Sequence, residues 1–334
     1  MTDAPTPAEP SPTTSADLTH RFRSWLAWAV AGAAMLYVAF GIWAGIPEVA
    51  SALGRFQWIW FVVGIVLTVV GNYLLRFLKW HWLLGRLDVK LPWGESALIF
   101  VAGLAMVISP AKAGEVLKPY LVRERTGVPM TRTIPALVTE RLTDGIAALI
   151  IAAVSVSKFA SDKTVYVYGV IGLVAVGIVI LMNERASLAI LHAMGRLKVL
   201  SRFTDKLEEL YKAMRLCLAP WPLFVTMVIS GIAWFAECWG YQLMWRGFDR
   251  DVSLEASSFL YAFATVAGGV SPGGLGVADT MLVGMPMTLL ALPKDEVTAV
   301  SMLIRTATLW TGVLMGAIAL LFVNRLLARP RRAA

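Results

Sequence analysis

The sequence is poor in charge and in the residues that hold metals or disulfides. Only 16% of its 334 residues are charged and 58% are hydrophobic, far from the balance of an average soluble domain. Two cysteines and three histidines (His20, His81 and His192) are present, and no histidine has a second ligand at metal-binding spacing. Walker loops and HExxH motifs are absent. These absences argue against a metalloenzyme and a nucleotide-driven pump, and we expect neither a metal nor a cofactor.

Long apolar runs take the place of those motifs. Most of them approach the roughly 20 residues that span a bilayer as a helix. The first run is longer than the apolar core of a signal peptide and is followed by more spans, so we expect it to be retained. The fold class predicted is an all-α polytopic membrane protein with about six transmembrane helices. The runs are Trp25–Ile46, Trp58–Leu75, Val165–Met182, Leu223–Ala236 and Ala307–Val323.

The two ends of the sequence differ from its middle. Residues 1–20 are rich in Pro, Ser, Thr and Ala without periodicity, which predicts a disordered tail. Residues 326–334 form a basic tail, and 21–325 are predicted to be a single integral membrane domain. The net charge of +8 is distributed along the chain rather than concentrated in one soluble module, so we expect no nucleic-acid partner.

Basic residues are concentrated in alternate connecting segments, which predicts the topology. If the N-terminus is cytoplasmic, the cytoplasmic segments hold most of the 30 Lys and Arg, as the positive-inside rule requires. Both termini are then cytoplasmic. Residues 184–218 mix basic with apolar side chains and are predicted to form an amphipathic linker on the membrane surface. The cytoplasmic segments are 21–23, Arg76–Lys90, Lys118–Arg132, Arg185–Arg215 and Arg325–Arg332.

This topology requires two apolar stretches, Glu95–Arg123 and Ser257–Leu290, to enter the membrane and return to the side they came from. Each is interrupted by a Ser-Pro pair and then by glycine. Proline removes a backbone donor and glycine permits a tight reversal, so each stretch is predicted to be a re-entrant hairpin of two half-helices. A pair of complete, thin spans is the alternative. The residues of the breaks are Ser109, Pro110, Gly114, Ser271, Pro272, Gly273, Gly274, Gly276 and Asp279.

The two hairpins also suggest an internal repeat. A shift of about 160 residues superposes Ser109-Pro110 on Ser271-Pro272, and a span precedes and follows each hairpin. The first repeat covers 57–157 and the second 221–323, and the charge topology makes them inverted. In inverted-repeat transporters broken helices meet near the membrane midplane and bind a polar substrate there. Because lipid cannot satisfy unpaired backbone groups, the breaks predict a polar cavity.

Charged residues at membrane depth form three candidate groups. Lys112, Glu115 and Lys118, spaced by three, are predicted to share one side of a short helix that follows the first break. A helix N-terminus beside lysines suits an anion. The alternative is an anchor at the cytoplasmic interface.

The second group is Glu140, Arg141 and Asp144 in the predicted span Ile134–Val156, where spacings of three and four place them on one helical face. Arg141 is predicted to bind a phosphate while an acid takes up a proton or an amine. A purely structural ion network is the alternative.

The third group comes from the second half of the chain and contains Arg305, Asp279 and Glu237. We expect Arg305 to be paired with one of these acids, because an unpaired charge at this depth is costly.

Two strings resemble the flippase-like membrane domain of lysylphosphatidylglycerol synthases: "SPAKAGEVLKPYLVRERTGVPMTRTIPALVTERLTD" and "SPGGLGVADTMLV". Family members often have Arg in place of Lys112 and Lys118, and Glu in place of Asp279. Full synthases also carry a soluble aminoacyl-transfer domain after the membrane part, whereas this sequence ends at Ala334, so we expect no synthase activity. The residues that match directly are Gly114, Glu115, Glu140, Arg141, Asp144, Pro272, Gly273, Gly274, Gly276 and Arg305.

The resemblance implies lipid translocation, or service to a lipid-modifying pathway, in the bacterial inner membrane. The leading hypothesis is a non-enzymatic protein that moves an anionic or phosphate-bearing lipid headgroup between leaflets, with membrane lipids as its partners. A second hypothesis is a membrane partner that docks a lipid-modifying enzyme through the basic surface at Arg185–Arg215. A third is an intramembrane transferase that uses Asp249 and Asp251.

Overall fold

The computed structural model describes residues 32, 34–109, 114–159, 172, 212–269 and 271–327. In these ranges the chain forms helices and no strands, which confirms the predicted all-α membrane fold. The elements are α2 (Ile46–Arg55), α3 (Trp58–Val66), η1 (Leu67–Leu74), α4 (Leu75–Arg86), α5 (Trp93–Leu104), η2 (Ala105–Ile108), α6 (Leu117–Thr126), α7 (Met130–Phe159), α11 (Pro220–Arg246), α12 (Leu254–Gly268), η6 (Pro272–Gly274), α13 (Val277–Leu290), α14 (Lys294–Arg305), η7 (Thr306–Trp310) and α15 (Thr311–Leu327).

Four described helical stretches are long and apolar enough to cross a membrane, and a pair bent by 95°, Ala34–Ala44 with Ile46–Arg55, would make a fifth. The first of the four joins α3, η1 and α4 into 29 residues, about 44 Å at 1.5 Å per residue, longer than a bilayer core of roughly 30 Å. Most of the predicted span Val165–Met182 lies outside the described residues, as do residues 1–20 and most of the linker. The four are Trp58–Arg86, Pro220–Arg246, Pro272–Leu290 and Lys294–Leu327.

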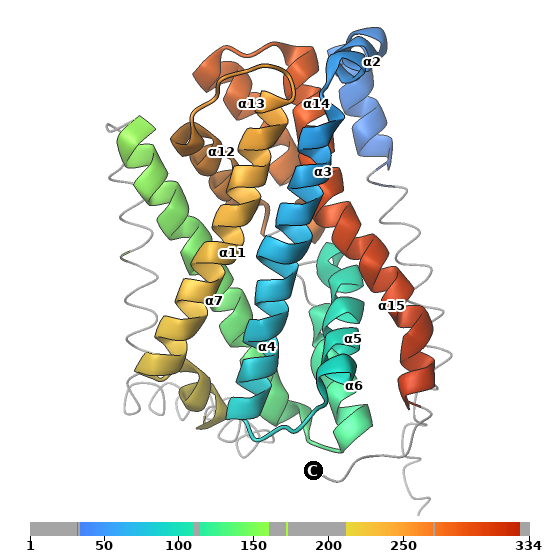
Figure 1. The fold of residues 1–334 in the computed structure, drawn as a ribbon, viewed down its shortest axis with the longest axis vertical. Helices are drawn as coiled ribbons and strands as arrows, with labels where there is room; N and C mark the ends of the chain where they lie inside the picture. Colours follow the sequence, from blue (N-terminus) through green and yellow to red (C-terminus); the bar gives the residue numbers. More distant parts are fainter. Residues whose placement is uncertain are drawn as a thin grey trace, which may run out of the picture.

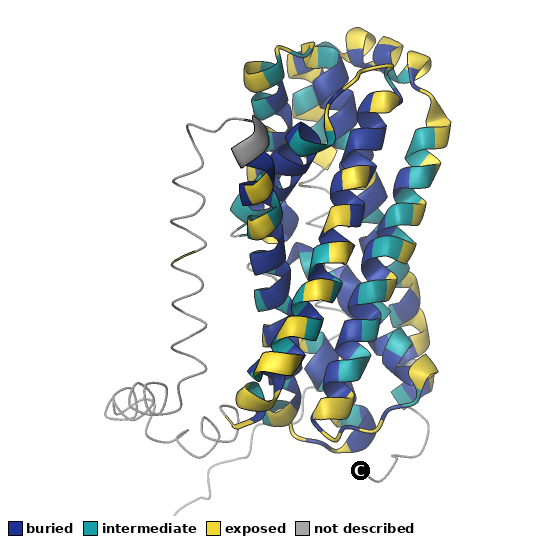
Figure 2. Cartoon of the chain, turned by 60° about the vertical axis from the view of Figure 1, so that its left-hand side comes forward, coloured by how far each residue is buried: buried dark blue, intermediate teal, exposed yellow. Residues whose placement is uncertain are grey.

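The outward faces of these helices are apolar. Val62, Val66 and Val70, spaced by four, are each more than half exposed along α3 and η1, as expected of a stripe that faces lipid. Figure 2 shows buried residues between the helices and exposed ones along their outer faces. The outer surface of the helices is therefore apolar, whereas charged side chains are buried between them.

The α-helical arms of both hairpins have 15 residues or fewer. The first has α5 with 12 residues, extended by η2, and α6 with 10. The second has α12 with 15 residues and α13 with 14. A helix of 15 residues is only about 22 Å long, short of the bilayer core. Together with η6, however, α13 forms the stretch Pro272–Leu290, which is long and apolar enough to cross a membrane, so the re-entrant form of the hairpins stays a prediction.

The two hairpins lie at opposite ends of the molecule. In Figure 1, α5 and α6 occupy the lower half, whereas α12 and α13 occupy the upper half. Their tips meet, because η2 packs against η6. The helices α7 and α11 run past both hairpins and pack against each other and against α12. This arrangement brings both sequence breaks to the middle of the molecule, and the inverted-repeat relation itself stays a prediction.

Candidate functional site

Charged residues from three helices form an ion network, here called the first ionic cluster. Its members are Arg76, Lys79, Glu115, Lys118, Glu140, Arg141 and Asp144. Glu140, Arg141 and Asp144 all lie on α7. Both acids contact Arg76 and Arg141, as expected of residues that share one helical face.

Glu140 is the centre of this cluster and is completely buried. Its Oε2 accepts a hydrogen bond of 2.6 Å from Lys118 Nζ. Its Oε1 accepts bonds of 3.0 Å from Arg76 Nη2 and 2.6 Å from Arg141 Nη2. Since three cations share one carboxylate, removal of any one of them leaves Glu140 still paired.

Asp144 anchors a fully buried lysine. Lys79 Nζ donates to Asp144 Oδ1 at 2.6 Å and to Ser230 Oγ on α11, also at 2.6 Å. Ser230 Oγ lies 2.9 Å from the same carboxylate oxygen. Arg76 Nε is 3.2 Å from Asp144 Oδ2. A buried ammonium is stable only when it is hydrogen-bonded and paired, and these contacts provide both conditions.

Arg76 and Lys79 were wrongly predicted to lie in a basic cytoplasmic segment. The structure continues the helix as α4 through Arg86 and buries both side chains. The sequence holds a signal for this, because the two basic residues are three apart within a run that stays apolar and aromatic through Leu84. That spacing places them on one helical face.

Lys118 joins the first hairpin to the cluster. It is 2% exposed, and its Nζ lies 4.7 Å from the ring centroid of Trp80 and 5.1 Å from that of Phe100, within the range of cation–π attraction. A Cβ on Gly103 of α5 would come within 2.5 Å of Lys118 Cγ. A glycine in α5 therefore makes room for the lysine of α6.

The predicted group of Lys112, Glu115 and Lys118 is only partly described. Lys112 and Pro110 lie outside the described residues. Glu115 lies in a 3-10 turn that leads directly into α6 at Leu117, one helical turn before Lys118. Glu115 still lies in the cluster, with its Oε2 2.9 Å from Arg141 Nη2 and 3.7 Å from Lys118 Nζ.

The second hairpin carries the predicted pair of Arg305 and Asp279. Arg305 Nε donates to Asp279 Oδ1 at 2.9 Å, and Arg305 Nη2 donates to the Gly273 carbonyl at 2.6 Å. Asp279 Oδ2 accepts the N–H of Gly276 at 3.0 Å, which caps the start of α13. The expectation that Arg305 is paired with an acid is confirmed. Glu237, grouped with it in the prediction, accepts a hydrogen bond of 2.7 Å from Tyr261.

Each hairpin break is held by its serine. Ser109 Oγ donates to the Met106 carbonyl at 2.7 Å and accepts the N–H of Gly114 at the same distance. Ser271 Oγ donates to the Gly268 carbonyl at 3.0 Å. Each hydroxyl thus adds a second hydrogen bond to a carbonyl that already accepts the N–H of the same serine, at a depth where lipid offers no donor.

The tips touch closely at Gly273. Its φ of 60° is left-handed, and a Cβ there would lie 2.6 Å from Ile108 Cγ2 of the first hairpin. Gly274 and Gly276 also have positive φ. Glycine at position 273 therefore meets two demands, a left-handed backbone and contact between the two tips.

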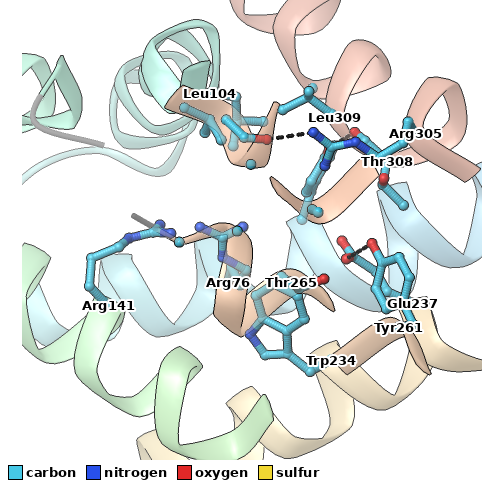
Figure 3. Close-up of a pocket in the computed structure, with 18 residues that line it drawn as sticks. Arg76, Leu104, Arg141, Trp234, Glu237, Tyr261, Thr265, Arg305, Thr308 and Leu309 are labelled. Atoms are coloured by element: carbon cyan, nitrogen blue, oxygen red, sulfur yellow. Dashed lines mark hydrogen bonds between the residues drawn. The ribbon is translucent and has the colours of Figure 1, made fainter. Parts of the chain in front are cut away.

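A cavity of about 80 Å³ lies beside the tips, with room for several water molecules. The side chains of Arg76, Arg141 and Arg305 line it together with Glu237, and the glycines of the second hairpin form part of its wall. In Figure 3, Arg76 and Arg141 approach from one side and Arg305 from the other. Two π-helical turns, η1 and η7, contribute Tyr73 and Thr308 to the lining, and such turns are frequent at functional sites.

The cavity is suited to an anion. Guanidinium groups bind carboxylate and phosphate oxygens in a bidentate manner, and here three of them converge from both halves of the chain. Arg141 keeps 22% of its side chain exposed, so its charge is available to the cavity as well as to the carboxylates behind it.

Comparison with known proteins identifies the family of this chain. The family model described as the lysylphosphatidylglycerol synthase TM region matches residues 24–316. The chain belongs to this family. It is also similar to a protein of Methanothermobacter thermautotrophicus named "UPF0104 membrane protein", with 22% identity over 309 residues that cover 85% of this chain and 89% of the relative.

In this member of the lysylphosphatidylglycerol synthase TM-region family, Asp249 and Asp251 lie away from the cavity. They line an open hollow at the α11–α12 connection with Gln57, which donates to Asp249 Oδ1 at 2.8 Å. The intervening Arg250 binds Glu296 through two hydrogen bonds, which raise the pKa of Arg250. Within the described ranges, no group of three or more Asp, Glu, His or Cys could hold a metal ion.

Proposed function

We propose that this protein moves an anionic, phosphate-bearing lipid headgroup between the two leaflets of the cytoplasmic membrane. The observation that carries the proposal is the cavity at the meeting point of two opposed hairpin tips, lined by Arg76, Arg141 and Arg305. A headgroup that crosses oil needs a polar path at mid-depth, and broken helices in transporters supply one.

The surroundings of the cavity support movement rather than a fixed site. The hairpins enter from opposite ends and contact each other through η2 and η6, so parting of one pair of elements would open the cavity toward one face. A lipid's acyl chains need no protein channel, because the outer faces of the helices are already apolar. Membership of a family named for a lipid synthase is consistent with a lipid substrate.

The test uses purified protein in phosphatidylglycerol-containing vesicles with a head-labelled anionic lipid in both leaflets. An impermeant reductant should bleach nearly all the label if the lipid is translocated, and only about half if it is not. Arg141→Gln should lower the rate at least tenfold. Arg325 is exposed on α15, so Arg325→Gln should leave the rate unchanged. Equal bleaching in vesicles with and without the protein would refute the proposal.

A further inference from the structure

The charges around the cavity are matched among the described residues. The five described cations equal the five described acids in number, so the described part of the site is close to neutral before any ligand enters. The cations are Arg76, Lys79, Lys118, Arg141 and Arg305, and the acids are Glu115, Glu140, Asp144, Glu237 and Asp279. An added phosphate would leave an uncompensated negative charge in a low-dielectric interior, which is costly. Anion binding should therefore be accompanied by a second ion.

Glu115 is the acid least committed to hydrogen bonds. It is 1% exposed, yet neither carboxylate oxygen makes a hydrogen bond with any described residue. Its contacts are ion pairs, 2.9 Å to Arg141 and 3.7 Å to Lys118. Burial without hydrogen bonds destabilises an ionised carboxylate unless a neighbouring cation compensates, and Arg141 is the nearer of the two cations beside Glu115.

The other four acids are held by more bonds. Glu140 accepts from Lys118, Arg76 and Arg141. Asp144 accepts from Lys79 and Ser230, and Asp279 accepts from Arg305 and the Gly276 N–H. Glu237 accepts from Tyr261. A ligand that draws one cation away would leave each of these carboxylates with a hydrogen-bonded partner.

Arg141 connects Glu115 to the cavity, because it lines the cavity while its Nη2 contacts Glu115. We infer that binding of a phosphate anion in the cavity draws Arg141 away from Glu115, and that Glu115 takes up one proton in response. The proton comes from water and converts the carboxylate to a carboxylic acid. The anion and the proton together leave the net charge of the site unchanged.

The groups that face Glu115 are consistent with this exchange. Lys118 follows it on its own hairpin, and Glu140 and Arg141 face it from α7. Arg76 of α4 binds Glu140 on the far side of the cluster. On α5, which also packs against α6, Glu95 is bound to Arg125 at 2.8 Å. Once Arg141 engages the ligand, Lys118 is still bound to Glu140 at 2.6 Å, so it compensates Glu115 weakly.

This inference rests on the proposed function, and its test separates the two. The probe is dihexanoyl phosphatidylglycerol, a soluble diester whose single charge does not titrate near neutral pH. Calorimetry in two buffers of different ionisation enthalpy measures the protons taken up on binding. We expect about one proton per lipid bound, and affinity that rises up to about tenfold for each pH unit lowered while Glu115 is ionised in the free protein.

Two variants make the test specific. Glu115→Gln should still bind the diester but take up no proton, and its affinity should no longer change with pH. Glu115→Asp should restore proton uptake, and it is the variant to use if the glutamine protein fails to fold. Glu124→Gln on the same hairpin arm, where Glu124 pairs with Arg123 near the surface, should behave as the wild type does.

The outcomes are distinct. Binding of the diester by the wild type without proton uptake overturns the inference and leaves the proposed function standing, as does equal proton uptake by the wild type and Glu115→Gln. No binding by the wild type at any pH refutes the proposed function and the inference with it.

Discussion

Each hairpin presents one acid to an arginine on the helix that follows it, and the two pairs are held differently. Glu115 and Arg141 are 2.9 Å apart, as are Asp279 and Arg305, and each acid precedes its arginine by 26 residues. The second pair is bonded to the backbone at Gly276 and Gly273. The first is bonded only to other charged side chains.

The Asp279–Arg305 pair is therefore a structural clamp, which means that it fixes the backbone of the hairpin tip. The Glu115–Arg141 pair is an ion pair whose partners can be exchanged. Arg305 and Asp279 fix the shape of the second hairpin tip, because both bind backbone groups of the break itself. Arg141 shares its charge among Glu115, Glu140 and Asp144. When Arg141 turns to a ligand, Glu140 and Asp144 keep other cations, and only Glu115 needs a proton. We therefore expect substitutions in the second pair to reduce stability and those in the first to change ligand response.

The largest effect is expected from Arg305→Met. It leaves Asp279, which is fully buried, without a cation, a situation that costs about 3–5 kcal/mol of unfolding free energy. Arg141→Met should cost less, under about 2 kcal/mol, because Glu140 retains Lys118 and Arg76 and because Glu115, which loses its nearest cation, can take up a proton. Thermal unfolding of the purified variants in detergent measures both. Equal losses would show that the two pairs are not different in kind.

A double variant checks the reason for that effect. Arg305→Met with Asp279→Leu removes both charges and should recover part of the lost stability, because no buried charge remains unpaired. If the double variant is less stable than Arg305→Met alone, the loss comes from packing rather than from the isolated carboxylate.

The second largest effect is expected from Gly273→Ala. The left-handed backbone costs about 1–2 kcal/mol for a residue with a Cβ, and the contact with Ile108 adds overpacking of about 1–3 kcal/mol. Gly127→Ala, just after α6, is the matched control, since its backbone is also left-handed with a φ of 78° but nothing lies within 4 Å of an added Cβ. Unfolding midpoints should rank the wild type highest and Gly273→Ala lowest. If both variants lower the unfolding midpoint equally, the contact between the two hairpin tips does not explain why position 273 is a glycine.

The sequence predicted the features that depend on local rules. The Ser-Pro and glycine breaks at both hairpins follow from backbone chemistry, and the common face of Glu140, Arg141 and Asp144 follows from helical spacing. The pairing of Arg305 with an acid follows from the cost of burying a charge.

Prediction from the sequence failed for residues whose partners are distant in the sequence. Arg76 and Lys79 pair with carboxylates 64 and 65 residues away, and the positive-inside rule counts such residues as surface charge unless their helix is known to continue.

A smaller effect is expected from Gly103→Ala in the first hairpin. The added Cβ meets the aliphatic part of the Lys118 side chain. This side chain can shift more easily than the backbone at a hairpin break, so the loss of unfolding free energy should be about 1 kcal/mol. Translocation should still fall, because Lys118 would move relative to Glu140. The unfolding midpoint and the vesicle assay measure the two effects, and a loss as large as that of Gly273→Ala would show that the first hairpin is as rigid as the second.

The smallest effect on stability is expected from Glu115→Gln. The change removes a buried charge that accepts no hydrogen bond from a described residue, so the lost ion pair and the relieved desolvation nearly cancel, leaving under about 1 kcal/mol. Asp279→Asn is the counterpart in the second hairpin and should cost about 2–4 kcal/mol, because it removes the charge that Arg305 requires. Unfolding midpoints at one pH compare them. If Glu115→Gln proves the more damaging of the two, Glu115 is a structural residue, and the first pair is a clamp like the second.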